Sequence, residues 1–358
     1  QILVINPGST STKISVYKGE EAIFTKSIEH NPKDLATPTI YDQYEMRSQI
    51  IARTLREEGF RGPQFSAVVA RGGLLPKARA GAYLVDQNLM YHLRHNEFIE
   101  HISNIGASLA FSLAEPFGLP SYIYDPVTVD EMEPIARITG LKEIERRSQG
   151  HMLNMRAAAI KQAKDTGGDY KNMTMIVVHM GGGITMSLHR QGRVIDMISD
   201  DEGPFAPERA GGLPGFQLIG LATEGGYDKT SLLRKVTRQG GFMSHFGTTD
   251  AKAVHQMMLD GDKRAGLVLE AMCHNVAKNI GKLAVVARGK VDFIVITGGL
   301  AYSPTFTGWI KERVEFLAPV SIIPGENEMH SLALGALRVL RGEEAAKKYD
   351  PDAEPPVE

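Results

Sequence analysis

Short apolar runs with the character of strands alternate along this chain with longer runs of helical period. The chain opens with three predicted strands at residues 2–6, 12–17 and 21–28, which are joined by short turns. Helical periods, such as that at 263–287, alternate with buried strands such as that at 65–70. This alternation of strands and helices predicts an α/β fold.

The opening pattern occurs again near the middle of the chain. A strand at 174–179, a turn of three glycines and two strands at 184–189 and 193–198 follow the order of the first three strands. Two unrelated hairpins could share this pattern, but a repeat of such length predicts two similar α/β domains. Their first hairpins could then face each other across a cleft. We place the first domain at residues 1–150 plus 329–358, with a returning C-terminal helix, and the second at 151–328.

Composition excludes several classes of function. The chain has 358 residues, of which 42% are hydrophobic and 23% are charged, as in a soluble globular protein. Its net charge of −2 argues against a nucleic-acid partner and against an anionic membrane surface. The longest apolar runs have the length of strands, so we expect no membrane span. The single cysteine, Cys273, fits a reducing compartment, and we expect a cytoplasmic protein in which this thiol is buried.

The first turn concentrates groups that bind phosphate. Residues 6–13 read Asn-Pro-Gly-Ser-Thr-Ser-Thr-Lys and provide backbone N–H groups, four hydroxyls and one cation. Phosphate oxygens prefer many hydrogen-bond donors and positive charge at close range. The segment is not a Walker A loop, because the second glycine is missing and a strand follows. An ordinary hairpin turn is the alternative.

Two further glycine turns follow predicted strands. Residues 181–183 are all glycine, and the glycine pair at 298–299 follows a strand at 292–296. Without side chains, such turns let the backbone approach a ligand closely. We predict that the triple glycine contacts phosphate and that the pair lies against the sugar or base of a nucleotide. A tight strand-to-helix turn is the alternative for the pair.

Charged side chains at strand ends complete the candidate site. Arg71 directly follows a buried strand, and ligands of α/β proteins bind at such ends. Arg209 lies in a long loop rich in Pro, Gly and charge, and such loops are usually functional. Asp125 ends another strand, and Glu326 and Glu328 precede the last helix. These carboxylates could hold Mg²⁺ or cap turns and helices. The histidines show no spacing that indicates zinc.

Several longer motifs follow one another along the chain. They begin at Asn6 (Asn-Pro-Gly-Ser-Thr-Ser-Thr-Lys), Ala70 (Ala-Arg-Gly-Gly-Leu-Leu), Asp125 (Asp-Pro-Val-Thr-Val-Asp-Glu), Ser199 (Ser-Asp-Asp-Glu-Gly-Pro-Phe), Pro207 (Pro-Glu-Arg-Ala-Gly-Gly-Leu-Pro) and Pro324 (Pro-Gly-Glu-Asn-Glu-Met). In this order they resemble the signatures of the acetokinase family, the short-chain carboxylate kinases, and within it the butyrate branch. The resemblance extends from Ile2 to about Leu340. It implies two ribonuclease-H-like domains of the actin-like ATPase architecture with a central nucleotide cleft, and a homo-oligomer of two or more chains.

The resemblance also implies roles for individual residues. It places Asn6 near the transferred phosphoryl group, with Arg71, Arg209 and His151 around it. Arg71 stands where the acetate branch has a histidine, and the arginine of that branch lies three residues earlier. The nucleotide and its phosphates are expected at Gly8, Ser9, Ser11, Lys13, His179, Gly181, Gly182, Gly183, Gly298 and Gly299. Mg²⁺ is expected at Asp125 and Glu328, with Glu326 as the alternative to Glu328.

The implied reaction is the reversible phosphorylation of butyrate, or of a similar short-chain or branched carboxylate, by ATP. A carboxylic acid with a pKa of about 4 is ionised at neutral pH, so direct in-line transfer requires no general base. The difficulty is the approach of two anions, which the arginines, His151, Lys13 and Mg²⁺ would relieve by positioning and neutralisation. An acetate or propionate kinase of the same family is the first alternative. A non-kinase ATPase related to actin or Hsp70 is the second.

Overall fold

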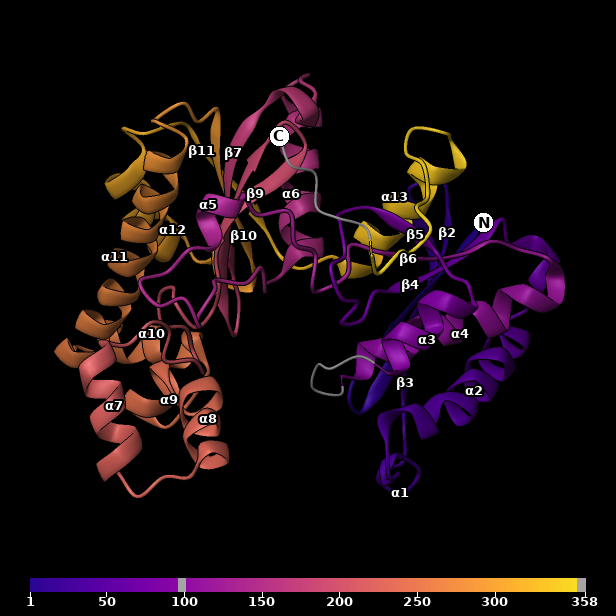
Figure 1. Cartoon of the computed structure of the whole chain (residues 1–358), viewed down its shortest axis with the longest axis horizontal. Helices are drawn as coiled ribbons and strands as arrows, with labels where there is room; N and C mark the ends of the chain where they lie inside the picture. The colour runs from indigo at the N-terminus through magenta and orange to yellow at the C-terminus, as the bar shows by residue number, and fades with distance from the viewer. Residues whose placement is uncertain (96–100, 353–358) are drawn as a thin grey trace. The chain divides into compact units, whose positions relative to one another are not determined.

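The computed structural model describes residues 1–95 and 101–352 of the chain. They form two compact units, both of which Figure 1 shows: Gln1–Asp130 together with the segment from Asn327 onward, and Glu131–Glu326. The first boundary falls earlier in the chain than the division at 150/151 that we expected from the sequence. Each unit contains one mixed β-sheet.

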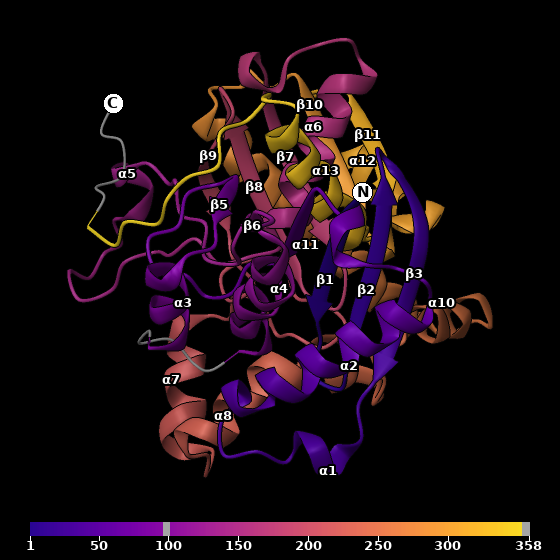
Figure 2. The ribbon, with the colours of Figure 1, turned by 90° about the vertical axis from the view of Figure 1, so that its right-hand side faces the viewer.

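The first unit is built on a six-stranded sheet with the order β3-β2-β1-β4-β6-β5. β1, β2 and β3 form an antiparallel meander, whose strands lie side by side in Figure 2. β1, β4 and β6 run parallel. The strands are β1 (Ile2–Pro7), β2 (Ser11–Lys18), β3 (Glu21–Glu29), β4 (Ala67–Arg71), β5 (Ala82–Leu84) and β6 (Ser121–Tyr124). The helices are α1 (Pro32–Leu35), α2 (Tyr44–Glu57), α3 (Gln87–Arg94), α4 (Gly106–Ala114) and α13 (Glu328–Leu340).

Alternating side chains give this sheet two covered faces. On one face, Leu3 and Ile5 of β1 belong to a buried cluster that includes Leu109 of α4. On the other face, α13 packs against β1, β4 and β6 and buries Leu332 and Ala336. Because Asn6 follows Ile5, its side chain leaves the sheet on the face that α13 covers.

The second unit repeats this topology. Its sheet has the order β11-β10-β7-β8-β9, in which β7, β8 and β9 form the meander and β7, β10 and β11 run parallel. The predicted repeat of a ribonuclease-H-like strand order is therefore confirmed. The strands are β7 (Thr174–Met180), β8 (Ile184–Arg190), β9 (Arg193–Ile198), β10 (Phe293–Gly298) and β11 (Val320–Pro324). The helices are α5 (Pro134–Arg137), α6 (Met152–Asp165), α7 (Gly215–Glu224), α8 (Lys229–Arg238), α9 (Gly241–Phe246), α10 (Ala251–Leu259), α11 (Lys263–Val286) and α12 (Pro304–Val314). Every helix that the structure describes is too short or too polar to cross a lipid bilayer.

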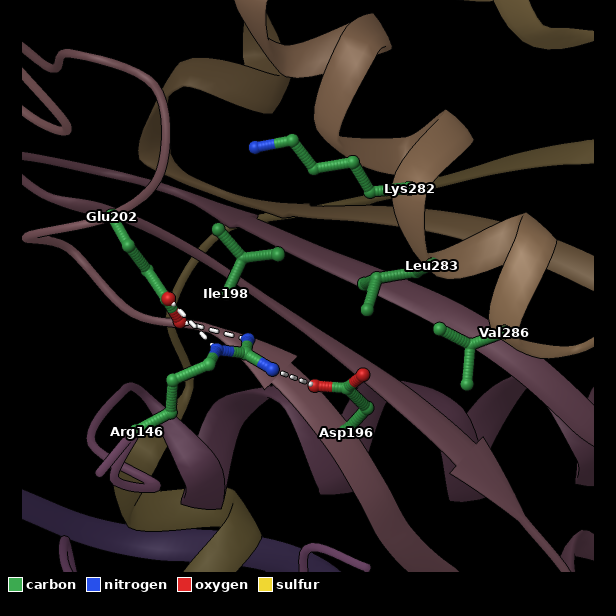
Figure 3. Close-up of a pocket in the computed structure, with 7 residues that line it drawn as sticks. All are labelled: Arg146, Asp196, Ile198, Glu202, Lys282, Leu283 and Val286. Atoms are coloured by element: carbon green, nitrogen blue, oxygen red, sulfur yellow. Dashed lines mark hydrogen bonds and ion pairs between the residues drawn. The ribbon is translucent and has the colours of Figure 1, made fainter. Parts of the chain in front are cut away.

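Arg146 explains why the segment before α6 belongs to the second unit. Its guanidinium donates to Asp196 Oδ1 at 2.9 Å and to the two carboxylate oxygens of Glu202, each at 2.9 Å, as Figure 3 shows. Asp196 lies in β9 and Glu202 in the loop that follows it. These side chains line a small cavity of about 190 Å³. One arginine thus connects the segment before α6 to the sheet and to the loop that carries Arg209.

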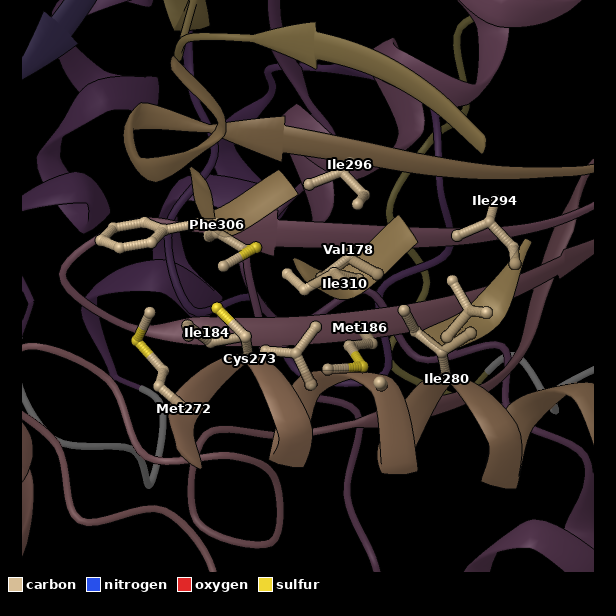
Figure 4. Close-up of a cluster of buried hydrophobic side chains, with 14 of the residues drawn as sticks. Val178, Ile184, Met186, Met272, Cys273, Ile280, Ile294, Ile296, Phe306 and Ile310 are labelled. Carbon is tan, nitrogen blue, oxygen red and sulfur yellow. The ribbon is translucent and has the colours of Figure 1, made fainter. Parts of the chain in front are cut away.

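The core of the second unit lies between its sheet and α11, where Figure 4 shows the side chains in contact. Val178, Ile184 and Met186 of the sheet are buried in one cluster with Ile280 of α11. Cys273 belongs to this cluster, and burial raises the pKa of its thiol to about 12. The predicted buried thiol is confirmed, and it is protonated at neutral pH.

The segment after α13 is bound to the first unit. The charge and proline content of residues 343–358 predict a frayed end, and this is wrong for the part that the structure describes. Lys347 N donates to Ala82 O at 2.9 Å, and Lys347 O accepts from Leu84 N at 2.8 Å, so the backbone pairs with β5. Tyr349 is buried, and its hydroxyl donates to Pro76 O at 3.0 Å. Backbone pairing and one aromatic anchor hold a segment whose composition is polar.

Acid should destabilise the fold through His189. Its ring is fully buried in β8, with Nδ1 2.7 Å from Tyr170 Oη and Nε2 2.7 Å from Ser187 Oγ. Burial, followed by the charge of Arg156, lowers the pKa of His189 to about 3. The unfolded chain has an ordinary histidine pKa of about 6.5 and therefore binds more protons between these two pH values. As the pH is lowered through this window, the free energy of unfolding should fall by about 1.4 kcal/mol for each pH unit.

Urea unfolding of the full chain at several pH values between neutral and mildly acidic conditions measures this slope. His189→Gln should flatten the pH dependence, because a glutamine keeps hydrogen-bonding groups but does not titrate. His274→Gln, which replaces an exposed histidine, should leave the slope unchanged. Equal slopes in the wild type and in His189→Gln would mean that the buried ring does not carry the effect.

Candidate active site

The turn between β1 and β2 is a tight hairpin with an open tip. Gly8 N donates to Ser11 O at 2.8 Å, and a Cβ at Gly8 would lie only 3.3 Å from the same oxygen. Ser9 and Thr10 at the tip are exposed. Behind the turn lies Arg47 of α2, which the sequence did not single out, and its Nη1 donates to Gly8 O at 2.9 Å. The expected phosphate turn therefore has free space on one side and a buried cation on the other.

Asn6, Lys13 and Arg71 lie beside one another on neighbouring strands. Asn6 is directly opposite Lys13 in the antiparallel pair of β1 and β2. In the parallel pair of β1 and β4, Ile5 is opposite Ala70. Asn6 and Arg71 are the next residues of the two strands, so they are neighbours as well. Paired residues of neighbouring strands project to the same face of a sheet. The three polar side chains thus form a row on the face that α13 covers.

Glu328, the first residue of α13, connects two members of this row. Its Oε2 accepts a hydrogen bond from Asn6 Nδ2 at 2.6 Å, and Arg71 Nη1 lies 3.1 Å from Oε1. The side chain of Arg71 is 30% exposed and that of Glu328 is 21% exposed, so both can still reach a ligand. A carboxylate at this position is also favoured by the helix dipole of α13. The structure therefore brings together the predicted residues Asn6, Arg71 and Glu328.

Asp125 directly follows β6 at the same end of the parallel strands. β4 and β6 pair in register, with Arg71 opposite Tyr124, so Asp125 comes one residue beyond that pair. The side chain is buried, and its Oδ1 accepts from Gly81 N at 2.6 Å. Its φ of +41° lies in the left-handed region, which Asp tolerates better than most residues. The predicted position at a strand end is confirmed, and its role towards a metal stays a prediction.

The turn between β7 and β8 is the counterpart of the first hairpin. Gly181 N donates to Gly183 O at 2.9 Å. A Cβ at Gly181 would lie 2.7 Å from Glu326 Oε1, and a Cβ at Gly183 would lie 2.8 Å from Arg209 Nη1. Gly182, at the tip, has open space around it apart from Glu208 at 3.6 Å. Gly181 and Gly183 therefore leave no room for a side chain, because charged side chains of the same unit approach their backbone.

His151 and His179 stack beside this turn. Their ring centroids are 4.0 Å apart with an angle of 14° between the planes, and His151 Nδ1 lies 3.0 Å from Thr185 Oγ1. His179 is fully buried in β7, and its Nε2 is 3.1 Å from Glu326 Oε1. The two atoms are not aligned for a hydrogen bond. The structure thus places the predicted residues His151, His179 and Glu326 together at the second glycine turn.

Arg209 lies between the second glycine turn and an acidic loop. Its guanidinium forms an ion pair with Asp200 and lies against Gly183. Burial, followed by the charge of Arg238, lowers the pKa of Arg209. A cation that is mostly removed from water and paired with one carboxylate gains from an additional anion. The predicted position of Arg209 beside the phosphate turn is therefore supported within the second unit.

A cavity of about 770 Å³ opens next to the same turn. Such a volume suits a nucleotide or another small ligand. Gly298, the last residue of β10, has a φ of +93°, and Gly299 begins the short helix Gly299–Tyr302. The cavity is lined by Gly181, Gly182, Pro207, Glu208, Thr249, Asp250, Ala251, Lys252, His255, Gly299, Leu300, Tyr302, Ser303, Pro304, Phe306 and Glu326. It joins the triple glycine to Gly299, one of the pair that the sequence predicts for the sugar or base.

The two glycines of this pair should respond differently to a methyl group. A Cβ at Gly298 would lie 2.4 Å from Met180 O, and the backbone has a left-handed φ, whereas nothing lies within 4 Å of a Cβ at Gly299. Gly298→Ala should therefore lower the free energy of unfolding by about 1–3 kcal/mol. Gly299→Ala should leave stability unchanged and weaken nucleotide binding, since Gly299 lines the cavity and its methyl group would meet no protein atom. Urea unfolding and ATP titration of both variants test this, and an equal loss of stability would contradict it.

A magnesium ion at the predicted carboxylates would have to be held partly by substrate phosphates. Among residues 1–95 and 101–352, no group of three His, Cys, Asp or Glu side chains could hold a metal ion alone. Mg²⁺ does not require such a group, because it is usually bound by one or two carboxylates together with phosphates and water. Glu328 and Asp125 provide two carboxylates at the carboxyl ends of β1, β4 and β6. Glu326, the alternative to Glu328, lies in the second unit beside Gly181.

Comparison with known proteins identifies relatives over nearly the whole chain. Residues 148–308 match the model of the acetokinase family. The chain is 45% identical to butyrate kinase 2 of Clostridium acetobutylicum over 352 residues, which cover 98% of this chain and 99% of the relative. It is 42% identical to a probable butyrate kinase of Clostridium botulinum over the same length, again 98% and 99% of the two chains. The crystal structure of Porphyromonas gingivalis acetate kinase has the same fold, with a TM-score of 0.81, 16% identity and coverage of 95% of this chain and 99% of that one.

Proposed function

Because the chain belongs to the acetokinase family, we propose that it transfers the γ-phosphoryl group of ATP to a short-chain carboxylate, with butyrate as the preferred acceptor. The product is an acyl phosphate, and the reaction is reversible toward ATP. The identity to relatives named butyrate kinase supports the choice of acceptor. The glycine hairpins, each beside an arginine, support the phosphoryl chemistry.

The proposed step is a direct in-line displacement. A carboxylate oxygen forms a bond to the γ-phosphorus while the bond from that phosphorus to the bridging oxygen of ADP breaks. ADP leaves with the electron pair, and no proton is transferred, because the acceptor is already ionised at neutral pH. The barrier is the mutual repulsion of the anions, so catalysis depends on positioning and on neutralisation of charge.

The residues of the first unit act on the transferred group. Asn6 and Arg71 share the carboxylate of Glu328, which fixes their orientation. In the proposed mechanism the Asn6 amide and the Arg71 guanidinium donate to phosphoryl oxygens, and Lys13 adds positive charge from the neighbouring strand. Ser9 and Ser11 present donors at the hairpin, and Gly8 closes its turn through the hydrogen bond from its N–H to Ser11 O. Mg²⁺, held by Glu328 and Asp125, would offset charge on the phosphates.

The residues of the second unit bind the nucleotide and the acceptor. The triple glycine offers bare backbone to phosphates, and Gly299, directly after Gly298, lines the cavity for the nucleoside. Arg209, with a guanidinium already mostly removed from water, donates to the acceptor carboxylate or to the transferred group. His151, oriented by Thr185 and by stacking on His179, donates to the same oxygens.

The observation that carries this proposal is the repetition of one arrangement in both units. Each meander has a tight first turn whose backbone is open, and each has an arginine next to it: Arg71 beside Asn6, and Arg209 against Gly183. Two sets of anion-binding groups suit a reaction between two anions. A sugar kinase would instead need a carboxylate base for its alcohol acceptor. The proposal requires both sets to act on one ATP molecule.

We also propose a cytoplasmic homo-oligomer of two or more chains. In the single chain, helix α7 has no buried residue, and its apolar side chains Phe216 and Ile219 are 90% and 61% exposed. A second copy of the chain would cover these side chains. Light scattering of the full chain measures the oligomeric state. Phe216→Ser should lower the average mass if this helix contributes to the contact, and a monomeric wild type would contradict the proposal.

The experiment for the acceptor is an acyl phosphate assay with ATP over straight and branched acids of two to six carbons. Hydroxylamine converts acyl phosphates to hydroxamates, which are measured by colour. We expect kcat/KM to be highest for butyrate, with isobutyrate and valerate also used and acetate poor, since each methylene contributes about 1–3 kcal/mol. A maximum at acetate or propionate would assign the chain to those kinases. ATP hydrolysis without hydroxamate would indicate a non-kinase ATPase.

A further inference from the structure

Arg47 is a fully buried arginine without a carboxylate partner in the described part of the chain. It lies on the inner face of α2, one turn before Ile51, and its exposed fraction is 0%. Its guanidinium contacts only neutral acceptors, namely backbone carbonyls, a hydroxyl and the Gln43 amide. A buried unpaired charge costs free energy. A residue that carries such a cost is a candidate for a functional role.

Most of these contacts are to the first glycine hairpin. Arg47 Nη1 donates to Gly8 O at 2.9 Å, to Ser11 O at 3.0 Å and to Thr12 Oγ1 at 2.9 Å, and Nη2 lies 3.2 Å from Ser9 O. The planar guanidinium offers its donors in a fixed geometry, so it imposes one arrangement on the carbonyls that it binds.

This arrangement determines where the N–H groups of the hairpin point. The peptide bonds of the hairpin are trans, and in a trans peptide the carbonyl and the following N–H point in opposite directions. Since Gly8 O and Ser9 O point to Arg47, the N–H groups of Ser9 and Thr10 point away from it, on the exposed side of the turn. Successive N–H groups directed to one side form an anion-binding concavity.

Gln43 holds Arg47 in this orientation from one turn earlier in the chain. Its Oε1 accepts from Nε at 3.2 Å and from Nη2 at 2.8 Å. Thr12 Oγ1, which accepts from Arg47, also lies 2.8 Å from His30 Nε2. Burial lowers the pKa of Arg47 to about 10, so the group is a cation at neutral pH. The hairpin therefore has a fixed positive charge directly behind its carbonyls.

We propose that Arg47 is a positioning residue for ATP: it holds the hairpin at residues 8–12 with its N–H groups turned outward and adds a positive charge behind the phosphates. The inference rests on the proposed function, in which this hairpin binds the phosphates of ATP. Arg47 does not touch the reacting atoms. Its loss should therefore act on nucleotide affinity and phosphate alignment and should affect the binding of the carboxylate acceptor little.

The test compares Arg47→Met, Arg47→Lys and Gln43→Leu with the control Arg53→Met, which replaces an exposed arginine of the same helix. Direct titration with a fluorescent ATP analogue gives nucleotide affinity, and the hydroxamate assay gives kcat and both KM values. We expect Arg47→Met to lower kcat/KM for ATP about 100-fold, as misplaced positioning groups do, with KM for butyrate within about twofold of the wild type. Arg47→Lys, which keeps the charge, and Gln43→Leu should lie between the wild type and Arg47→Met, and Arg53→Met should match the wild type.

A merely structural arginine would give a different pattern. It would reduce the fraction of active protein, so that kcat falls while both KM values and the nucleotide affinity of the folded fraction stay normal. That pattern, or normal ATP parameters in folded Arg47→Met, would overturn the proposal. If Arg47→Met does not fold, an unchanged KM for ATP in both Arg47→Lys and Gln43→Leu would overturn the proposal. A wild type that binds ATP but forms no acyl phosphate would refute the proposed function alone, because the titration still tests Arg47.

Discussion

Arg209→Ala should lower kcat for acyl phosphate formation by about 10³-fold or more, since an arginine that stabilises phosphoryl transfer contributes this much. Arg209 lies against Gly183 and is paired with Asp200 in a mostly buried position. Water at such a position cannot stabilise the phosphoryl group as well as the lost guanidinium does. The hydroxamate assay with saturating ATP and butyrate measures the loss. Arg209→Lys should recover only part of the activity, because an ammonium group cannot donate two parallel hydrogen bonds to a carboxylate or phosphoryl group.

Arg234→Ala is the matched control for this prediction. Arg234 is an exposed arginine of α8 in the same unit, so its loss changes the net charge equally without affecting the glycine turn. We expect its kcat to stay within about twofold of the wild type, as for most surface substitutions. Near-normal turnover of folded Arg209→Ala would remove Arg209 from the mechanism.

Glu328→Gln should lower kcat by about 100-fold or more and raise the Mg²⁺ concentration needed for half-maximal rate, since loss of one group that orients or neutralises phosphate costs this much. The carboxylate accepts from Asn6 at 2.6 Å and pairs with Arg71 at 3.1 Å, so a neutral amide weakens both contacts and removes the carboxylate that we propose as a metal ligand. Rates measured over a range of Mg²⁺ concentrations separate the metal effect from the loss of orientation.

Glu326→Gln provides the comparison, because Glu326 is two positions earlier in the chain but belongs to the other unit. It contacts His179 and the backbone of Gly181 rather than Asn6 and Arg71. We expect a loss of less than about tenfold, in the range of indirect effects, with an unchanged Mg²⁺ requirement. If Glu326→Gln has the higher Mg²⁺ requirement instead, the metal ligand is Glu326.

The sequence predicts those parts of the site that lie at the ends of strands. Asn6 and Arg71 each follow or end a clear apolar strand, and parallel strands that are neighbours in a sheet bring their carboxyl ends together. Lys13 lies near the start of the second strand, which returns antiparallel from the turn and so brings this residue opposite Asn6. The repeat of the meander likewise predicts the equivalent position of the second glycine turn. The hydrophobic pattern is sufficient for these features because it determines both the strand and the residue at which the strand ends.

Other features could not be predicted from the same patterns. Helical periodicity treats an arginine as exposed, so it gives no signal that Arg47 is buried beneath the hairpin. Spacing cannot separate Glu326 from Glu328, because the unit boundary between them depends on which sheet each backbone joins. The polar composition after α13 predicts fraying, whereas Lys347 and Tyr349 are held by backbone pairing and burial. The segment before α6 joins the second unit through the long-range contacts of Arg146.

The most direct test of the whole account is phosphorus NMR of the full chain incubated with ATP, Mg²⁺ and butyrate. The account predicts that the signal of the γ-phosphate is replaced by that of butyryl phosphate in an amount equal to the ADP formed, with no turnover when butyrate is omitted. Inorganic phosphate in place of the acyl phosphate, or equal turnover without the acid, would contradict it.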